Sequence, residues 1–224
     1  MNKLLLVEDI KELRAGEYDI SYNQDTQLKV TGKTIMSNID KNNCSLDIEL
    51  ASDAEVFLDK VNVITKDMHI NIKMNQNSHL VLNWVIINDG NNKVVLDINM
   101  LGNNNKAEVH VRVINKNIDD SADVICNGMV CAGTIDNELL EDLKGLLMND
   151  NTIKISPNMN VGTNETMANH LVTIGPLSRE ELFYLMSRGM SKKQARALMR
   201  DSFACSLVNE NLKEQIKMEV KDIE

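Results

Sequence analysis

Apolar and polar residues alternate along the chain from about residue 45 to residue 115. Successive side chains of a strand point to opposite faces, so this period-two pattern predicts strands with one buried face each. From Met68 onward the apolar sets recur at intervals of roughly 12–14 residues, which is typical of an all-β array. The sets are Leu46, Ile48 and Leu50; Met68, Ile70, Ile72 and Met74; Leu80, Leu82, Trp84 and Ile86; Val94, Leu96, Ile98 and Met100; and Ala107, Val109, Val111 and Val113.

Polar segments rich in Asn and Gly separate these sets, at 75–78, 89–92 and 102–105. Both residue types tolerate the left-handed backbone conformation that tight turns require. A β-sandwich and a β-solenoid both satisfy the pattern, and periodicity alone does not choose between them. The aromatic content of 3% favours the solenoid, whose narrow interior is filled by stacked aliphatic rows.

The pattern becomes helical near residue 175. Ser178 and Glu181 form a predicted capping box, and Gly189 is a C-terminal stop. Ser191 and Gln194 begin a second helix that runs to about Phe203. A third helix is expected from Asn209, with an apolar face at Leu212, Ile216 and Val220. We therefore expect a β core over 1–175, with its first ~40 residues unassigned, and a helical region over 176–224.

Charge and composition exclude several classes of function. The chain carries 24 Lys and Arg against 33 Asp and Glu, a net charge of −9, which argues against binding duplex nucleic acid. It has no apolar run near the roughly 18 residues that span a bilayer. The apolar run after Lys3 ends at Val7, shorter than the about 7–15 residues of a secretory signal. We expect a cytoplasmic protein without a membrane or nucleic-acid partner.

The cysteines and most histidines fit ordinary packing. Cys44, Cys126, Cys131 and Cys205 contain no CxxC pair, and the spacing of Cys126 and Cys131 matches no common zinc site. We expect free thiols. Residues 126–132 resemble the last well-formed coil of the β core before the tail. His69, His79 and His110 alternate with apolar residues, which predicts that they lie on the outer face.

One stretch, residues 145–203, resembles a known family. Its ordered motifs are GLLM at 145–148, SPNMNV at 156–161, ANHLVTIG at 168–175, LFYLMSRGMS at 182–191 and QA at 194–195, ending at Phe203. Together they resemble the C-terminal signature of the SufB/SufD family of iron–sulfur cluster assembly proteins. The resemblance implies a right-handed parallel β-helix followed by helices.

The same resemblance implies a function. It implies a scaffold subunit, not an enzyme, that pairs with itself or with a SufB/SufD-like homologue and binds a SufC-like ABC-type ATPase. It places the ATPase contact near Phe183, Tyr184, Arg188 and Gly189. Consistently, the sequence contains no GxxxxGK[ST] phosphate-binding loop.

Two features depart from the SufB pattern. Full-length family members are longer, so this chain resembles a short or minimal form. SufB-type chains also carry a cysteine upstream of the motif proline and a glutamate after the motif histidine. The segment 148–152 here contains no cysteine, and Leu171 follows His170. The chain is therefore closer to SufD or to a reduced scaffold.

His170 is the main candidate metal ligand, because imidazole suits iron and a carboxylate such as Glu165 can orient its second nitrogen. Cys131 is the next candidate, since thiolate is the usual ligand of iron–sulfur clusters. Any cluster is expected to be transient. Two alternatives remain: a stand-alone β-solenoid that binds polysaccharide or acts as an adhesin, and an enzyme with His170 as general base. No paired nucleophile supports the enzyme.

Overall fold

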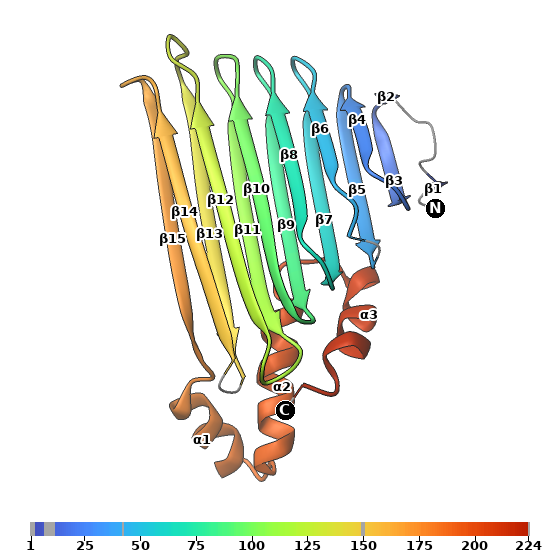
Figure 1. Ribbon diagram of the computed structural model, residues 1–224, viewed down its shortest axis with the longest axis vertical. Helices are drawn as coiled ribbons and strands as arrows, with labels where there is room; N and C mark the ends of the chain where they lie inside the picture. The colour runs from blue at the N-terminus through green and yellow to red at the C-terminus, as the bar shows by residue number, and fades with distance from the viewer. Residues whose placement is uncertain (1–2, 7–11, 42, 149–150, 224) are drawn as a thin grey trace.

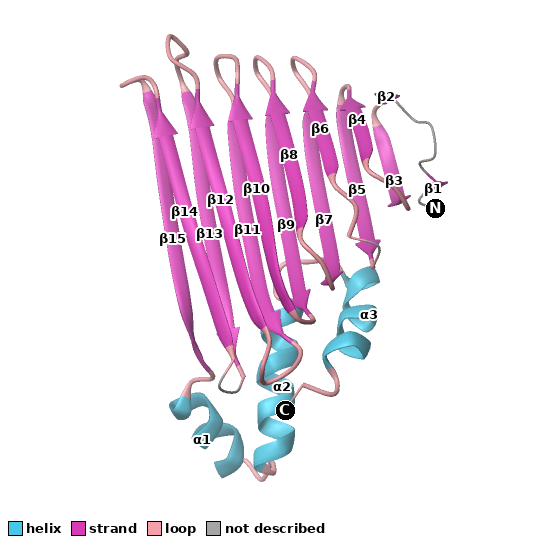
Figure 2. Ribbon diagram, viewed as in Figure 1, coloured by secondary structure: helices cyan, strands magenta, loops and turns pink. Residues whose placement is uncertain are grey.

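The computed structural model describes residues 3–6, 12–41, 43–148 and 151–223. It is a parallel β-helix followed by helices, as Figures 1 and 2 show. One sheet has eight strands, in the order β1 (Lys3–Leu6), β3 (Gly16–Ser21), β5 (Lys33–Asp40), β7 (Glu55–Ile64), β9 (His79–Asn88), β11 (Lys106–Asn115), β13 (Asn137–Leu147) and β15 (Thr166–Pro176). The other has seven, in the order β14 (Thr152–Val161), β12 (Ser121–Val130), β10 (Asn91–Met100), β8 (Met68–Met74), β6 (Leu46–Leu50), β4 (Thr26–Val30) and β2 (Glu12–Leu13).

Consecutive strands alternate between the two sheets, so each pair of strands makes one coil of the solenoid. Every strand pairs in parallel with strands of the coils before and after it, as with β7, β9 and β11. A sandwich of antiparallel hairpins is therefore excluded, and the predicted β-helix is confirmed. The first forty residues, left unassigned by the sequence, contribute β1 to β5 within the described ranges.

The predicted apolar sets fill the space between the sheets. They lie on β6, β8, β9, β10 and β11, and all of their members are buried. Parallel pairing stacks equivalent positions, so Leu58, Leu82 and Val109 form one continuous row. The array continues through β13, β14 and β15, so residues 126–132 are not the last well-formed coil before the tail, as the sequence had indicated. Charged residues and Pro157 interrupt the alternation in β13 and β14, and β15 carries the adjacent polar residues Asn169 and His170.

The turns from the seven-stranded sheet to the eight-stranded sheet form a stacked column. Asp53, Asn77, Asn104 and Asp136 occupy equivalent positions in successive coils, each with a positive φ between 54° and 62°. Asn77 Nδ2 donates to Asp53 Oδ1 at 3.0 Å, and Asn104 Nδ2 donates to Asn77 Oδ1 at 3.0 Å. The Asn-rich turns thus supply the predicted left-handed conformation and also bond one coil to the next.

One buried polar cluster interrupts the aliphatic interior near the N-terminal end. Lys60 is fully buried, and its Nζ lies 2.5 Å from both the Tyr22 hydroxyl and Asn38 Oδ1. Asn62 Nδ2 donates to Asp40 Oδ2 at 3.2 Å beside it. Burial lowers the pKa of Lys60 to about 7, although the Asp40 charge opposes that shift.

Three helices follow the strands in the described residues: α1 (Arg179–Ser187), α2 (Lys192–Cys205) and α3 (Glu210–Val220). Ser178 caps α1 through the Glu181 amide, and Gly189 follows with a φ of 94°. Ser191 and Gln194 form the complete capping box predicted for α2. Asn209 is the N-cap of α3 by position, without a side-chain capping bond.

The helices α2 and α3 cover the outer face of the eight-stranded sheet at one end of its strands (Figure 1). Leu212, Ile216 and Val220 are buried, as predicted, in a cluster with Val85 and Ile114 of the sheet. None of the helices in the described part of the chain is long and apolar enough to cross a membrane.

Candidate functional site

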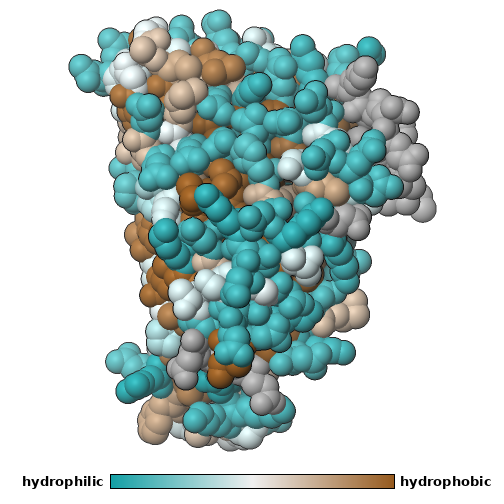
Figure 3. All heavy atoms as spheres, in the orientation of Figure 1, coloured by the Kyte–Doolittle hydropathy of each residue, from teal (hydrophilic) through white to brown (hydrophobic). Residues whose placement is uncertain are grey.

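The last coil of the β-helix, β14 and β15, forms an open end. In the part of the chain that the structure describes, each of these strands lies at the edge of its sheet, without a strand on its outer side. Large apolar side chains are exposed there: Met167 is 65% exposed and Leu171 is 54% exposed. Hydrophobic residues accordingly appear along the left margin of Figure 3, where Figure 1 places β14 and β15. An apolar edge of this kind is typical of an interaction surface.

His170, the main predicted ligand, lies on β15 within this open end. Ala168 and Val172, two positions before and after it, pack against the core, so His170 points to the interior side of the coil. It is in register with Glu141 of β13, one coil below. The imidazole is exposed, because β15 is the last strand of its sheet within the described ranges.

Beneath the open end, a thiol and a carboxyl group from opposite sheets meet in the interior. Cys126 lies on β12 and Glu141 on β13, and both are buried. The Cys126 Sγ donates to Glu141 Oε1 at 3.2 Å, whereas Glu141 Oε2 has no hydrogen-bond partner among the described residues. Burial raises the pKa of Glu141 to about 7. Burial, followed by the neighbouring carboxylate, raises the pKa of the Cys126 thiol well above its usual value.

The other two candidates lie elsewhere. Cys131 is half-buried in the turn after β12, where its amide donates to the Met100 carbonyl at 3.1 Å. Glu165 is exposed in the turn before β15. Glu165 and His170 are five positions apart along extended chain, roughly 16 Å at about 3.3 Å per residue. In the described ranges, no group of three or more His, Cys, Asp or Glu side chains is arranged to hold a metal ion. The structure therefore does not join His170, Cys131 and Glu165 in one centre.

The residues predicted to contact an ATPase do lie together, on and just after α1. Phe183 is 74% exposed and Tyr184 is 56% exposed. The Arg188 guanidinium stacks over the Tyr184 ring at 5.2 Å from its centroid. Gly189 follows in the left-handed conformation that ends the helix. These groups form a compact aromatic and cationic surface, which we call the α1 surface (Phe183, Tyr184, Arg188 and Gly189).

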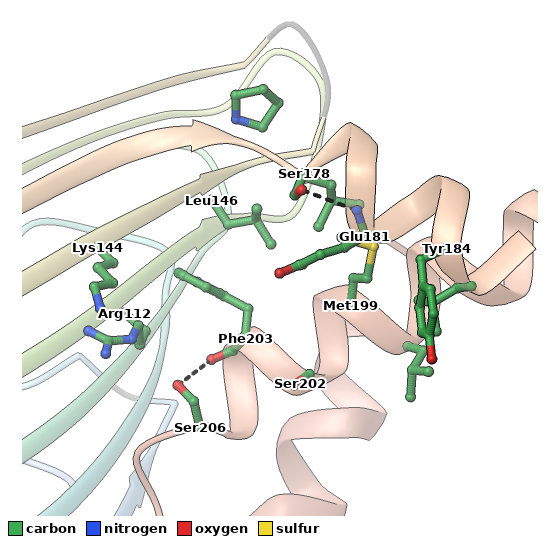
Figure 4. Close-up of a pocket in the computed structure, with 14 residues that line it drawn as sticks. Arg112, Lys144, Leu146, Ser178, Glu181, Tyr184, Met199, Ser202, Phe203 and Ser206 are labelled. Atoms are coloured by element: carbon green, nitrogen blue, oxygen red, sulfur yellow. Dashed lines mark hydrogen bonds between the residues drawn. The ribbon is translucent and has the colours of Figure 1, made fainter.

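A cavity of about 680 Å³ separates α1 from the sheet. Arg112, Lys144 and Leu146 of the strands line one side, while Tyr184 and Phe203 of the helices line the other. Figure 4 shows Phe203 and Glu181 projecting into this space. No residue of α1 is fully buried, and its exposed side chains, such as Phe183 and Tyr184, are available to a partner.

Sequence reasoning missed Glu141 and gave Cys126 little weight. A signal was present: Leu139, Glu141 and Leu143 alternate, which places a carboxylate in an otherwise apolar inward row. The contact with Cys126 was not readable, because it depends on how the two sheets face each other.

Comparison with known proteins yields one family match. A family model described as "SUF system FeS cluster assembly, SufBD core domain" matches residues 12–203, which is most of the chain. No curated protein matches the chain significantly.

Proposed function

The chain belongs to the SufB/SufD family of SUF-system iron–sulfur cluster assembly proteins, and from this premise we propose that it is a scaffold subunit. In this role it docks a SufC-like ABC-type ATPase through the α1 surface and pairs with itself or a homologue through its open end. It is a cytoplasmic binding protein, not an enzyme, and its motifs are closer to those of SufD than to those of SufB. The iron–sulfur cluster is its cargo.

The observation that carries this proposal is the unburied α1 helix. A short helix without buried residues gains little stability from packing, so its exposed aromatic side chains need another explanation. Phe183, Tyr184 and Arg188 are residue types enriched in binding hot spots. Their position agrees with the ATPase contact that the family resemblance implied.

The positive charge of α1 and α2 favours an acidic partner at the α1 surface. Residues 179–205 carry six Arg and Lys against three Asp and Glu, in a chain whose net charge is −9. A local excess of positive charge steers association with a negative surface and weakens with salt. We therefore propose that the ATPase presents acidic residues around an apolar pocket that receives Phe183.

A co-purification experiment tests the docking. Phe183→Ala and Arg188→Glu should each reduce recovery of the cognate ABC-type ATPase, by more than about tenfold if the residue is a hot spot. Met218→Ala is the matched control, because Met218 is also an exposed apolar residue of a helix, on α3. Normal recovery with both α1 variants, or no complex with the wild type, would contradict the proposal.

A further inference from the structure

Apolar side chains from three elements line the cavity between α1 and the eight-stranded sheet. Leu146 comes from the sheet, Leu198 and Phe203 come from α2, and Leu185 comes from α1. Leu198 is 48% exposed. Apolar side chains gain free energy when they leave water. These walls would therefore be stabilised by meeting one another.

Oppositely charged residues line opposite sides of the same cavity. Arg112 and Lys144 are in register on adjacent strands, and both lie on the sheet side. Glu181 lies on the α1 side, and Figure 4 shows it projecting away from its helix into the space. The charges on the two sides attract each other.

The sheet side carries more positive than negative charge. Arg112 donates through Nη2 to Asp142 Oδ2 at 2.9 Å and through Nη1 to two backbone carbonyls. Lys144 Nζ lies 3.4 Å from Asp142 Oδ1, and its side chain is 36% exposed. Two cations thus share one carboxylate, and the Lys144 ammonium retains donors for a second. Glu181 supplies that second carboxylate if α1 moves toward the sheet.

The helix α1 can move as a unit without losing its own hydrogen bonds. At its start, the Glu181 amide donates to the Ser178 hydroxyl oxygen. At its end, the Met190 amide donates to the Leu185 carbonyl, and Gly189 has the left-handed conformation of a helix stop. Within the described residues, α1 packs mainly against α2, and none of its side chains is buried.

We propose that α1 is a lid over the cavity and that the structure describes its open position. In the closed position Glu181 pairs with Lys144, and Leu185 meets the apolar wall formed by Leu146 and Phe203. The short segments on either side of α1 absorb the change of angle, as the ends of an element do in hinge motions. The inner face of α1 itself thus fills the cavity.

The lid regulates the docking of the ATPase, and this consequence rests on the proposed function. Tyr184 lines the cavity and also belongs to the α1 surface. Closure moves Tyr184 toward the sheet and withdraws part of the α1 surface from a partner. A partner that binds this surface therefore selects the open position, and the pair of Glu181 with Lys144 opposes docking.

Amide hydrogen exchange of the free full chain tests the lid without any partner. Glu181→Gln and Lys144→Met each remove one charge of the closed pair. The amides of α1 should then exchange about two- to fivefold faster, the effect of losing one solvent-accessible ion pair. A variant with both changes should exchange no faster than Glu181→Gln alone, because the pair is already lost. Added salt should raise the wild-type rate toward that of the variants.

Glu180→Gln is the matched control, because Glu180 lies in the same first turn of α1 but does not line the cavity. It removes a similar interaction with the helix dipole, so only the excess effect of Glu181→Gln measures the pair. Equal effects of the two glutamine variants would overturn the lid. Additive effects of Glu181→Gln and Lys144→Met would overturn it as well.

Recovery of the cognate ATPase then tests the regulation. Glu181→Gln and Lys144→Met should both raise recovery above that of the wild type, by up to about fivefold, as the lid shifts to its open position. Lys144→Met also removes a positive charge, which by itself would weaken attraction to an acidic partner. Unchanged or lower recovery with Lys144→Met overturns the regulatory role. A wild type that captures no ATPase contradicts the proposed function instead, and the exchange experiment still decides whether α1 is a lid.

Discussion

Lys60 and Gly128 are two interior residues that differ from the aliphatic side chains around them. Lys60 keeps its hydrogen bonds to Tyr22 and Asn38 but loses its hydration. Gly128 removes a side chain where the strands and Glu141 leave no space for one. Each produces a measurable consequence in the stability of the fold.

Lys60→Met should abolish a pH dependence of stability. Burial lowers the pKa of Lys60 to about 7, whereas lysine in the unfolded chain has a pKa of about 10.4. Between those values the unfolded state binds more protons, so the free energy of unfolding rises with pH and falls as pH drops toward 7. Urea unfolding from about pH 7 to about pH 10 should show that the wild type gains stability relative to the variant.

The exposed Lys33, which pairs with Glu55, provides the control as Lys33→Met. The free energy of unfolding of Lys33→Met should change with pH as that of the wild type does across the same range. Parallel curves for the wild type and Lys60→Met would show that Lys60 keeps its ordinary pKa despite burial.

Gly128→Ala should destabilise the fold by about 1–3 kcal/mol, the usual cost of overpacking a core. The new methyl group would clash with Leu139, whose Cδ2 lies 2.4 Å from the position of the added Cβ. Gly175→Ala is the matched control, because nothing lies within 4 Å of a Cβ there. Chemical denaturation of both variants gives the comparison, and equal midpoints would contradict the expected clash.

At the scale of elements, the three helices differ in how they are held. Burial of Ala195, Arg200, Ala204 and Cys205 anchors α2, and a complete capping box begins it. Three apolar residues anchor α3 in the same cluster. The helix α1 has a cap but buries nothing, and a cavity lies beneath it.

Amide hydrogen exchange should therefore separate α1 from α2. Helices with few buried contacts open locally at low free-energy cost, so the amides of α1 should exchange faster than those of α2. Addition of the cognate ATPase should slow exchange in α1 specifically. Equal protection of the two helices in the free protein would argue that α1 is packed more firmly than its exposure indicates.

At the scale of the molecule, a β-helix has two ends, and this one exposes apolar residues at its C-terminal end. Edge strands with large apolar side chains promote association unless another element covers them. The helices cover the outer face of the eight-stranded sheet instead of this edge (Figure 2). Our proposal that the chain pairs through this end follows from that arrangement.

Leu171→Glu should shift the oligomeric state toward monomer. Leu171 is 54% exposed on the edge strand β15, so a charge there would be buried without a partner in any pairing through this edge. Light scattering after size exclusion measures the mass. Ile118→Glu, an equally exposed position in the turn between β11 and β12, should leave the mass unchanged. An unaltered wild-type dimer in Leu171→Glu would place the interface elsewhere.

Much of the fold could be predicted from the sequence, because periodicity and turn chemistry are local. The alternation at Leu80 and Leu82 predicted a strand, and Asn77 and Asn104 predicted turns. Ser191 and Gln194 predicted where α2 begins. The ordered motifs around His170 determined the family, which the family match confirms. The prediction was limited in β13 and β14, because Glu141 and Pro157 break the apolar pattern of these strands.

Only the tertiary structure decided which distant residues meet. The parallel register places Glu141 beside His170, 29 positions later, and the facing of the two sheets brings Cys126 to Glu141. The tertiary structure also decided that α1 stays exposed. The helices α2 and α3 pack against the sheet, whereas a cavity lies between the sheet and α1. Such contacts depend on strand register and on the distance between layers, and these are set by the whole core, not by any local segment.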